Sequence, residues 1–177
     1  MAVSGVNPTD WKSRAGDGSG TPPPGGWQVP NHDGAGLIVG VGNGVDTGLM
    51  HKRVWVWEAA HQRPWGTAAQ YTVVPAKQAS LLGPSAPYEL GAALGVPFLT
   101  AHRCLTVGET MPDRIDPGSF TGRTVLVQGG AGAVGNAAIQ LATGPAHMIG
   151  VQSMKRMSAA KQTLTSGTQA IASPIVC

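Results

Sequence analysis

The chain has 177 residues, of which 42% are apolar and only 12% charged, with 26 glycines and 14 prolines, so it is not a charge-rich disordered chain. Its net charge of +3 comes from scattered residues with no basic stripe, and no nucleic-acid partner is expected. Two cysteines, Cys104 and Cys177, exclude a disulfide framework, and no cysteine–histidine cluster of the kind that holds zinc is present.

The chain up to about residue 79 is predicted to be rich in β-strands. A proline–glycine loop occupies residues 21–26. Apolar or alternating runs bounded by turn residues predict strands at residues 34–41, 53–57, 66–74 and 78–82. Several short strands at this spacing indicate a small barrel or sandwich.

The pattern becomes helical beyond these strands. Residues 88–105 carry apolar side chains at mixed spacing around Pro97, which predicts two helical pieces broken at the proline. Residues 108–122 are polar, contain Pro112 and Pro117, and are predicted to form a surface loop.

Residues 124–142, TVLVQGGAGAVGNAAIQLA, predict a strand, a glycine-rich turn and a helix. Gly130, Gly132 and Gly135 satisfy the G-x-G-x-x-G pattern in the context that gives it meaning. Gly130 would allow the tight turn, Gly132 the approach of a pyrophosphate, and Gly135 close packing of the helix. The helix N-terminus, with Ala133 and Val134, would offer N–H groups to phosphates. The alternative is an ordinary glycine-rich strand–helix turn.

The residues after the next predicted strand, 147–151, indicate which dinucleotide is preferred. An NAD enzyme usually has an acidic residue there to bind the ribose hydroxyl, whereas this chain reads QSMKR without an acid. Ser153, Lys155 and Arg156 suit a 2′-phosphate, which favours NADPH. The alternative is a solvated basic turn. Beyond it, a helix over residues 157–164 and a third strand over 169–176 are expected.

The order of these motifs resembles the medium-chain dehydrogenase/reductases, and specifically their zinc-independent quinone oxidoreductase branch, the zeta-crystallin-like proteins. The matching segments are GVNPTD at residues 5–10 with Arg14 and Gly16, DGAG at 33–36, YTVVP at 71–75, GVPFLTAHR at 95–103 and GGAGAVG at 129–135.

The resemblance implies an α/β fold with a β-rich first part. A partial GroES-like β domain (residues 1–107) would be followed by the first half of a Rossmann domain (residues 108–177), a doubly wound parallel sheet, with the active site in the cleft between them. It also implies hydride transfer from NADPH to a quinone, enone or related carbonyl compound. A soluble cytoplasmic protein without a membrane partner is expected, with a homodimer possible for the full-length chain.

The resemblance also implies roles for single residues. Asn7 stands where the zinc-using branch has a cysteine, and it would lie near the nicotinamide carboxamide or the substrate carbonyl; the alternative is a turn residue before Pro8. Thr100 is a candidate cofactor contact or proton donor, or else a packing residue. His32 is more readily a loop histidine than a metal ligand, and no metal is expected. Asp10 and Arg14 would form an (i, i+4) pair.

Some features depart from the family pattern. By this resemblance, the chain would be about half the usual length, shortened at both ends, and would contain only the adenine-side half of the nucleotide domain. His51 and Lys52 replace a glycine-led turn, where His51 would be strained if its φ is positive. Gly144 and Pro145 end the first helix early. An alternative hypothesis is therefore a non-catalytic fragment that acts at most as a nucleotide-binding or interaction module.

Overall fold

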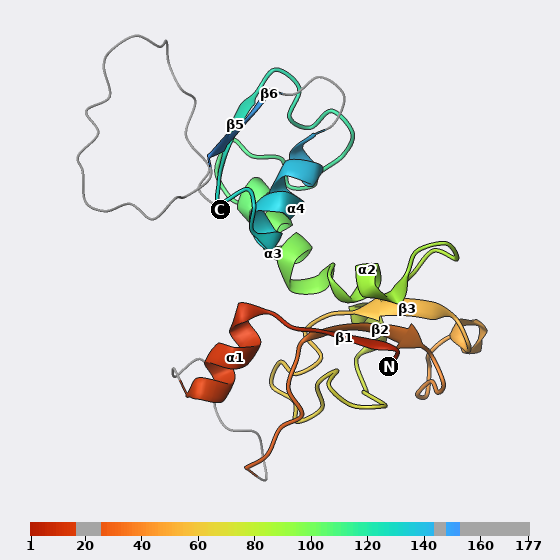
Figure 1. The fold of residues 1–177 in the computed structure, drawn as a ribbon. Coiled ribbons are helices and arrows are strands. Elements are labelled where there is room, and N and C mark those ends of the chain that lie inside the picture. Colours follow the sequence, from red (N-terminus) through yellow and green to blue (C-terminus); the bar gives the residue numbers. More distant parts are fainter. Residues whose placement is uncertain (17–25, 144–147, 153–177) are drawn as a thin grey trace. The chain divides into compact units, whose positions relative to one another are not determined.

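The structure is a computed structural model that describes residues 1–16, 26–143 and 148–152. The chain divides into two compact units, Met1–Val96 and Pro97–Cys177 (Figure 1). Ser153, Lys155 and Arg156 lie outside the described residues, as do the helix and the third strand predicted beyond them.

The first unit is built on an antiparallel sheet of four strands in the order β1-β2-β3-β4. Its strands are β1 (Val3–Gly5), β2 (Asp33–Leu37), β3 (Arg53–Val56) and β4 (Ala79–Leu81). Ala35, at the centre of β2, pairs with Val3 on one side and Trp55 on the other. The short helix α2 (Tyr88–Ala92) packs on β1, β2 and β3. A small apolar core of Ala35, Leu82 and Ala92 lies between the helix and the sheet.

The β-rich prediction for this unit is confirmed, but its described strands form one open sheet and not the predicted small barrel or sandwich. Two predicted strands also need correction. Strand β2 ends at Leu37 and not at residue 41. The strand predicted over residues 66–74 is absent, because its first N–H groups bond to a neighbouring loop and not to a strand. Gly66 N–H donates to Val29 O (2.9 Å), and Thr67 N–H donates to Asn31 O (3.0 Å).

Helix α1 (Pro8–Ala15), between β1 and β2, was missing from the sequence prediction although the sequence contains its start signals. Asn7 is the N-cap, and Pro8 occupies the first turn, where a missing N–H costs nothing. Asp10, at the third helical position, accepts the Asn7 N–H through Oδ2 (2.6 Å). Gly16 then ends the helix in the left-handed conformation, at φ 76°.

Residues 88–105 form two helical pieces as predicted, but the break between them lies before Gly95 and not at Pro97. Helix α2 ends at Ala92 and α3 (Gly95–Thr106) begins three residues later. Pro97 lies in the first turn of α3, where its N–H would have no intrahelical acceptor. The N–H groups of Ala93 and Leu94 close the break by bonding to Leu90 O and Gly91 O.

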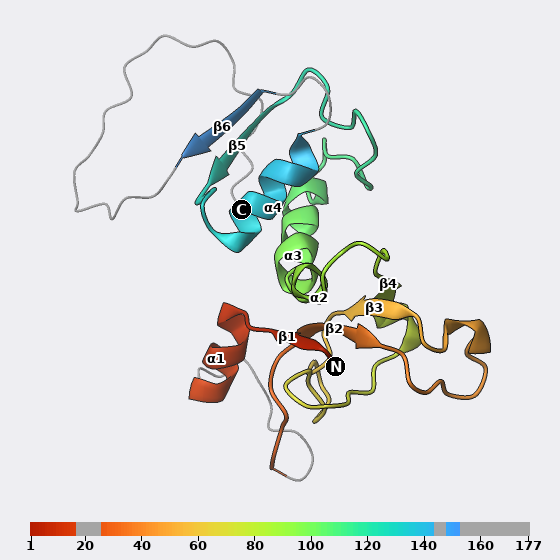
Figure 2. The same cartoon turned by 45° about the vertical axis from the view of Figure 1, so that its right-hand side comes forward.

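The second unit contains a parallel strand–helix–strand motif (Figure 2). Strands β5 (Thr124–Gln128) and β6 (Met148–Gln152) pair in parallel, and α4 (Ala133–Ala142) connects them. The predicted strand, turn and helix are thus confirmed, and Thr143 ends α4 as expected. The core of this unit is entirely apolar: Ala101, Leu105, Phe120, Val125, Val127, Ala137, Ala138 and Ala142.

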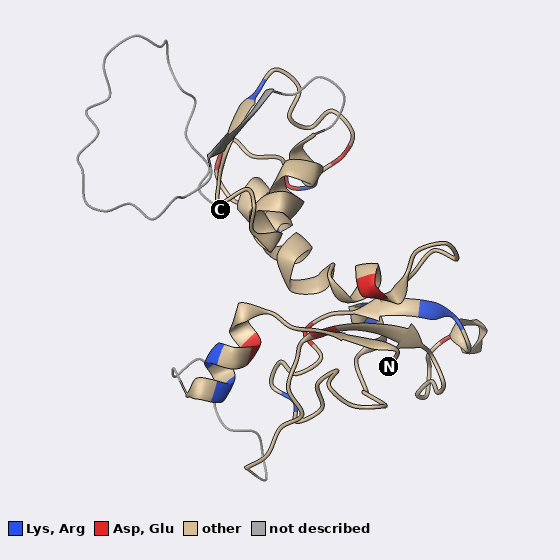
Figure 3. Ribbon diagram, in the orientation of Figure 1, with Lys and Arg blue, Asp and Glu red and all other residues tan. Residues whose placement is uncertain are grey.

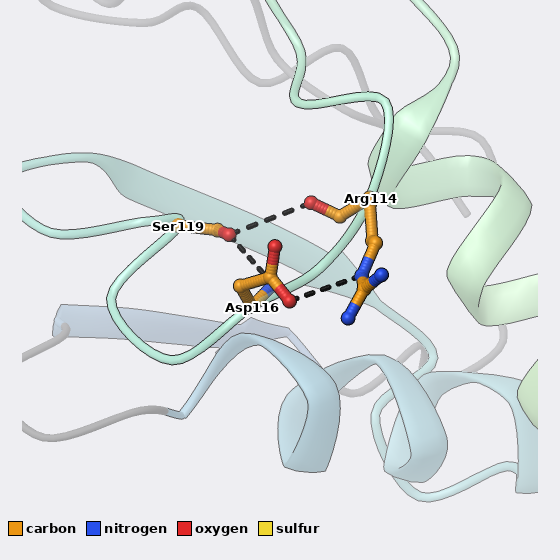
Figure 4. Close-up of polar contacts among 3 residues, drawn as sticks. All are labelled: Arg114, Asp116 and Ser119. Atoms are coloured by element: carbon orange, nitrogen blue, oxygen red, sulfur yellow. Dashed lines mark hydrogen bonds and ion pairs between the residues drawn. The ribbon is translucent and has the colours of Figure 1, made fainter.

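Residues 108–122 contain neither helix nor strand, as predicted, and polar contacts fold the loop upon itself (Figure 4). Arg114 Nε lies 3.1 Å from Asp116 Oδ1, and Asp116 N–H donates to Ser119 Oγ (2.8 Å). The two charged side chains are 81% and 58% exposed, so the ion pair contributes little stability. Phe120, only 2% exposed, anchors the loop in the core of the second unit.

Charged residues are few along the described chain (Figure 3). Helix α1 carries both signs, yet the expected pair of Asp10 and Arg14 is not formed, because the Asp10 carboxylate is only 7% exposed and caps the helix. Arg114 and Asp116 make the only ion pair found among the described residues. No helix in the described part of the chain is long and apolar enough to cross a membrane.

Candidate functional site

A buried polar cluster of Asn7, Asp10 and Asp33 lies in the first unit. Asn7 Nδ2 donates to Asp33 Oδ2 at 2.8 Å, and the same oxygen accepts the Val96 N–H from the first turn of α3 at 2.7 Å. Asn7 also donates its backbone N–H to Asp10. These bonds connect the end of β1, the start of β2, and the starts of α1 and α3, so the cluster fixes Asn7 from two sides.

The cluster is almost closed to water, and this changes the acidity of Asp33. Asp33 is fully buried, and Asn7 and Asp10 are 8% and 7% exposed. Burial raises the pKa of Asp33 to about 6; hydrogen bonds from Val96 and Asn7 oppose this, and the charges of Asp10 and Glu58 add to it. The Oδ1 atoms of Asp10 and Asp33 are buried and have no hydrogen-bond partner among the described residues.

Two glycines allow the backbone to close on Asp33. A Cβ on Gly95 would overlap the Asp33 carboxylate, and a Cβ on Gly5 would overlap Ala92 O and approach Asp33 Cβ. Both glycines belong to the family-like segments of the sequence. Glycine is required at residue 95 by the close approach of α3 to this carboxylate, and at residue 5 mainly by the close approach of β1 to Ala92 O.

His32 lies next to the cluster and is partly buried. Burial lowers its pKa, while the charge of Asp10 opposes that change. A metal site would need several ligands. Among the described residues, no group of three or more histidine, cysteine or acidic side chains could hold a metal ion.

The glycine-rich turn of the second unit lies between β5 and α4. Gly129 has a φ of 71° and is the left-handed residue of the turn, one position before Gly130, to which the sequence pattern assigned the tight turn. Gly132 N–H donates to Gly129 O at 2.8 Å and closes the turn. A Cβ on Gly135 would overlap the carbonyl of Gly129, so the predicted close packing of the helix at Gly135 is present.

The N-terminus of α4 is exposed at Gly132 and Ala133, and its first N–H groups have no hydrogen-bond partner among the described residues. Gly132 is the N-cap of α4. The Asn136 N–H donates to Gly132 O (2.8 Å), which is the first backbone hydrogen bond of the helix. The N–H groups of Ala133, Val134 and Gly135 precede it and have no intrahelical acceptor. Gly132 and Ala133 are exposed, so an anion can approach these donors.

The predicted site residues therefore fall into two groups. The structure brings Gly130, Gly132, Ala133, Val134 and Gly135 together at one turn of the second unit. Asn7 lies in the polar cluster of the first unit. Thr100 is exposed on the part of α3 that belongs to the second unit.

Sequence reasoning assigned no structural role to Asp33 and the wrong one to Asp10. Asp10 had a recognisable signal, because an acidic residue three positions after an N-cap is typical of a capping box. Asp33 had only a weak one, a carboxylate at the start of a glycine-rich, apolar strand.

Comparison with known proteins places these observations in a family. Residues 1–84 match the alcohol dehydrogenase GroES-like domain. The chain is 33% identical over 144 residues to a quinone oxidoreductase of Lama guanicoe, covering 80% of this chain and 39% of that protein. It is 32% identical over 148 residues to an NADPH-dependent alkenal/one oxidoreductase of Arabidopsis thaliana, covering 80% and 35%.

A solved structure supports the same relationship. The alcohol dehydrogenase superfamily protein from Novosphingobium aromaticivorans superposes with a TM-score of 0.73 at 30% identity, covering 88% of this chain and 44% of that one. The chain thus spans less than half the length of these relatives.

Proposed function

We propose a function from the premise that the chain belongs to the medium-chain dehydrogenase/reductases: it is an oxidoreductase that transfers a hydride from NADPH to a quinone, enone or related carbonyl acceptor without zinc. The observation that carries this proposal is the turn from Gly129 to Gly135, which is exposed at Gly132 and Ala133 and leads into the N-terminal N–H groups of α4. The names of two relatives, a quinone oxidoreductase and an NADPH-dependent alkenal/one oxidoreductase, support the choice of acceptor.

The turn fits the pyrophosphate of a dinucleotide. Gly132 has extended backbone angles and an exposed position, and the absence of its Cβ leaves the donors of α4 open. The helix dipole adds partial positive charge at this point. Gly130, Ala133, Val134 and Gly135 would complete the site, and Ser153, Lys155 and Arg156 would bind the 2′-phosphate.

Bound NADPH would supply the hydride, and the chain's own residues would orient the reactants and provide the proton. Asn7 would hold the nicotinamide carboxamide or the substrate carbonyl by hydrogen bonds. Its 8% exposure means that a ligand reaches only a small part of the side chain. The exposed Thr100 hydroxyl, or a water molecule, would give a proton to the reduced acceptor. Zinc independence is supported by Asn7, whose amide nitrogen donates to Asp33 and is not a metal ligand.

The proposal is tested by following NADPH oxidation with a quinone and with an enone as acceptor. A sharp variant is Gly132→Asp, because aspartate is a favoured N-cap and its charge repels phosphate. Its Cβ would lie 3.3 Å from Gly129 O, so the turn must yield slightly while α4 keeps its cap. Losing one charge-assisted bond costs about 1.5–3 kcal/mol, so NADPH should bind roughly 10- to 100-fold more weakly.

The matched control is Gly42→Asp, at an exposed glycine where a Cβ would meet nothing within 4 Å. It should leave both binding and turnover unchanged. NADPH binding without turnover would contradict the oxidoreductase proposal and leave a nucleotide-binding module. Unchanged binding in Gly132→Asp would contradict the assignment of the turn.

A further inference from the structure

The hydrogen bond between Asn7 and Asp33 fixes which end of the Asn7 side-chain amide faces Asp33. An amide side chain has a donating NH2 end and an accepting oxygen, whereas an ionised carboxylate can only accept. Because Asp33 Oδ2 lies 2.8 Å from Asn7 Nδ2, ionised Asp33 holds the NH2 end of the amide. The same Oδ2 accepts the Val96 N–H, which fixes the carboxylate against the start of α3.

A proton on Asp33 would change the orientation of the Asn7 side-chain amide. A protonated carboxyl group can donate, and Asn7 could then turn and accept through its oxygen. For this to happen, the proton must lie on Asp33 Oδ2, the oxygen that Asn7 contacts, because a proton on Oδ1 would leave Oδ2 an acceptor and the amide unturned. The charged groups that act on Asp33 are Asp10 from α1 and Glu58 from the segment after β3, and both raise its pKa, which burial brings to about 6.

We propose that Asp33 is a positioning residue for Asn7, whose carboxylate decides which atom of the Asn7 amide is left for a ligand. The inference rests on the proposed function for the identity of that ligand, a nicotinamide carboxamide or an acceptor carbonyl. Asp33 is held by its bonds to Asn7 and the Val96 N–H, and a Cβ on Gly95 would overlap its carboxylate. Asn7 therefore follows the protonation state of Asp33, which itself stays in place.

The direct test is nuclear magnetic resonance of the Asn7 side-chain amide in the unmodified full chain as pH is varied. The Asn7 NH2 signals, identified by their loss in Asn7→Ser, should shift with a midpoint near the Asp33 pKa of about 6. Asp33→Asn should abolish that titration. The control is Asp46→Asn, because Asp46 also accepts a backbone N–H, that of Gly48 at 2.8 Å, but is exposed.

Asn7 signals that do not move with pH in the unmodified chain would overturn the proposal, and only the assignment of these signals needs the Asn7→Ser variant. The same titration persisting in Asp33→Asn would also overturn it. In turnover, Asp33→Asn should lower kcat roughly 10- to 100-fold while the KM for NADPH stays unchanged, since the glycine turn is intact. An unmodified chain without turnover would refute the proposed function, while the amide titration would still decide the role of Asp33.

Discussion

The two units of the molecule bury different kinds of residue. Among the described residues, every buried polar side chain belongs to the first unit: Asn7, Asp10, Asp33, Thr67 and Gln78. The buried side chains of the second unit form an apolar cluster, in which alanines let helices and strand approach closely. The first unit thus adds hydrogen bonds between distant segments to its own apolar core, whereas the buried side chains of the second are apolar. Each difference can be tested by substitution.

The largest expected effect comes from removing volume in the second unit. Phe120 is 2% exposed, and Phe120→Ala should lower the free energy of unfolding by about 3–5 kcal/mol. Hydrogen exchange should show the loss of protection in β5 and α4. Leu126→Ala, at a side chain 38% exposed, is the control and should cost much less. Equal losses in the two variants would contradict the packing account.

A smaller effect, which depends on pH, is expected in the first unit. The pKa of Asp33 rises from 3.8 to about 6 on folding, so the folded state holds this proton more tightly. The contribution of this proton to the free energy of unfolding is fully present below pH 3.8 and is lost as pH rises through about 6. The free energy of unfolding changes by about 3 kcal/mol over this range. Urea unfolding of Asp33→Asn should lack this loss.

The comparison must be made against the unmodified chain, because His32 acts in the opposite direction. Burial lowers the His32 pKa below 6.5, so its contribution is present above pH 6.5 and is lost as pH falls. Asp46→Asn should keep the pH dependence of the unmodified chain. If Asp33→Asn keeps it as well, Asp33 is not the group responsible.

The smallest effect is expected at His51, which has a φ of 60°, the condition under which a non-glycine residue is strained at this position. A left-handed non-glycine residue costs about 1–2 kcal/mol, whereas glycine loses about 0.5–1 kcal/mol of backbone entropy on folding. His51→Gly should therefore raise the free energy of unfolding by up to about 1 kcal/mol. The thermal midpoint should rise slightly as a result. A lower midpoint would mean that the imidazole makes a compensating contact.

The two units also differ in how far their sequence predicted them. Apolar periodicity located β5 and α4 to within a residue or so, because their side chains pack on elements close in sequence. In the first unit, Asp33 bonds to residues 26 and 63 positions away, and no local pattern contains such bonds. The same dependence on distant partners explains the strand wrongly predicted over residues 66–74.

The candidate site divides in the same way. The glycines of the second unit could be predicted because the turn needs a close backbone approach. Their binding of a cofactor stays a prediction, as do the roles of Asn7 and Thr100. The role of Asp33 could not be predicted, since it becomes visible only when Asn7 and Val96 are brought to the same oxygen.

The most direct test of the central claim, that the turn of the second unit binds NADPH, is a thermal melt of the full chain with NADPH and, in parallel, with NADH. A ligand at a hundredfold excess over its Kd adds about 2.7 kcal/mol to the folded state. The account predicts a midpoint raised by several degrees with NADPH and by less with NADH. An unchanged midpoint with both nucleotides would contradict it.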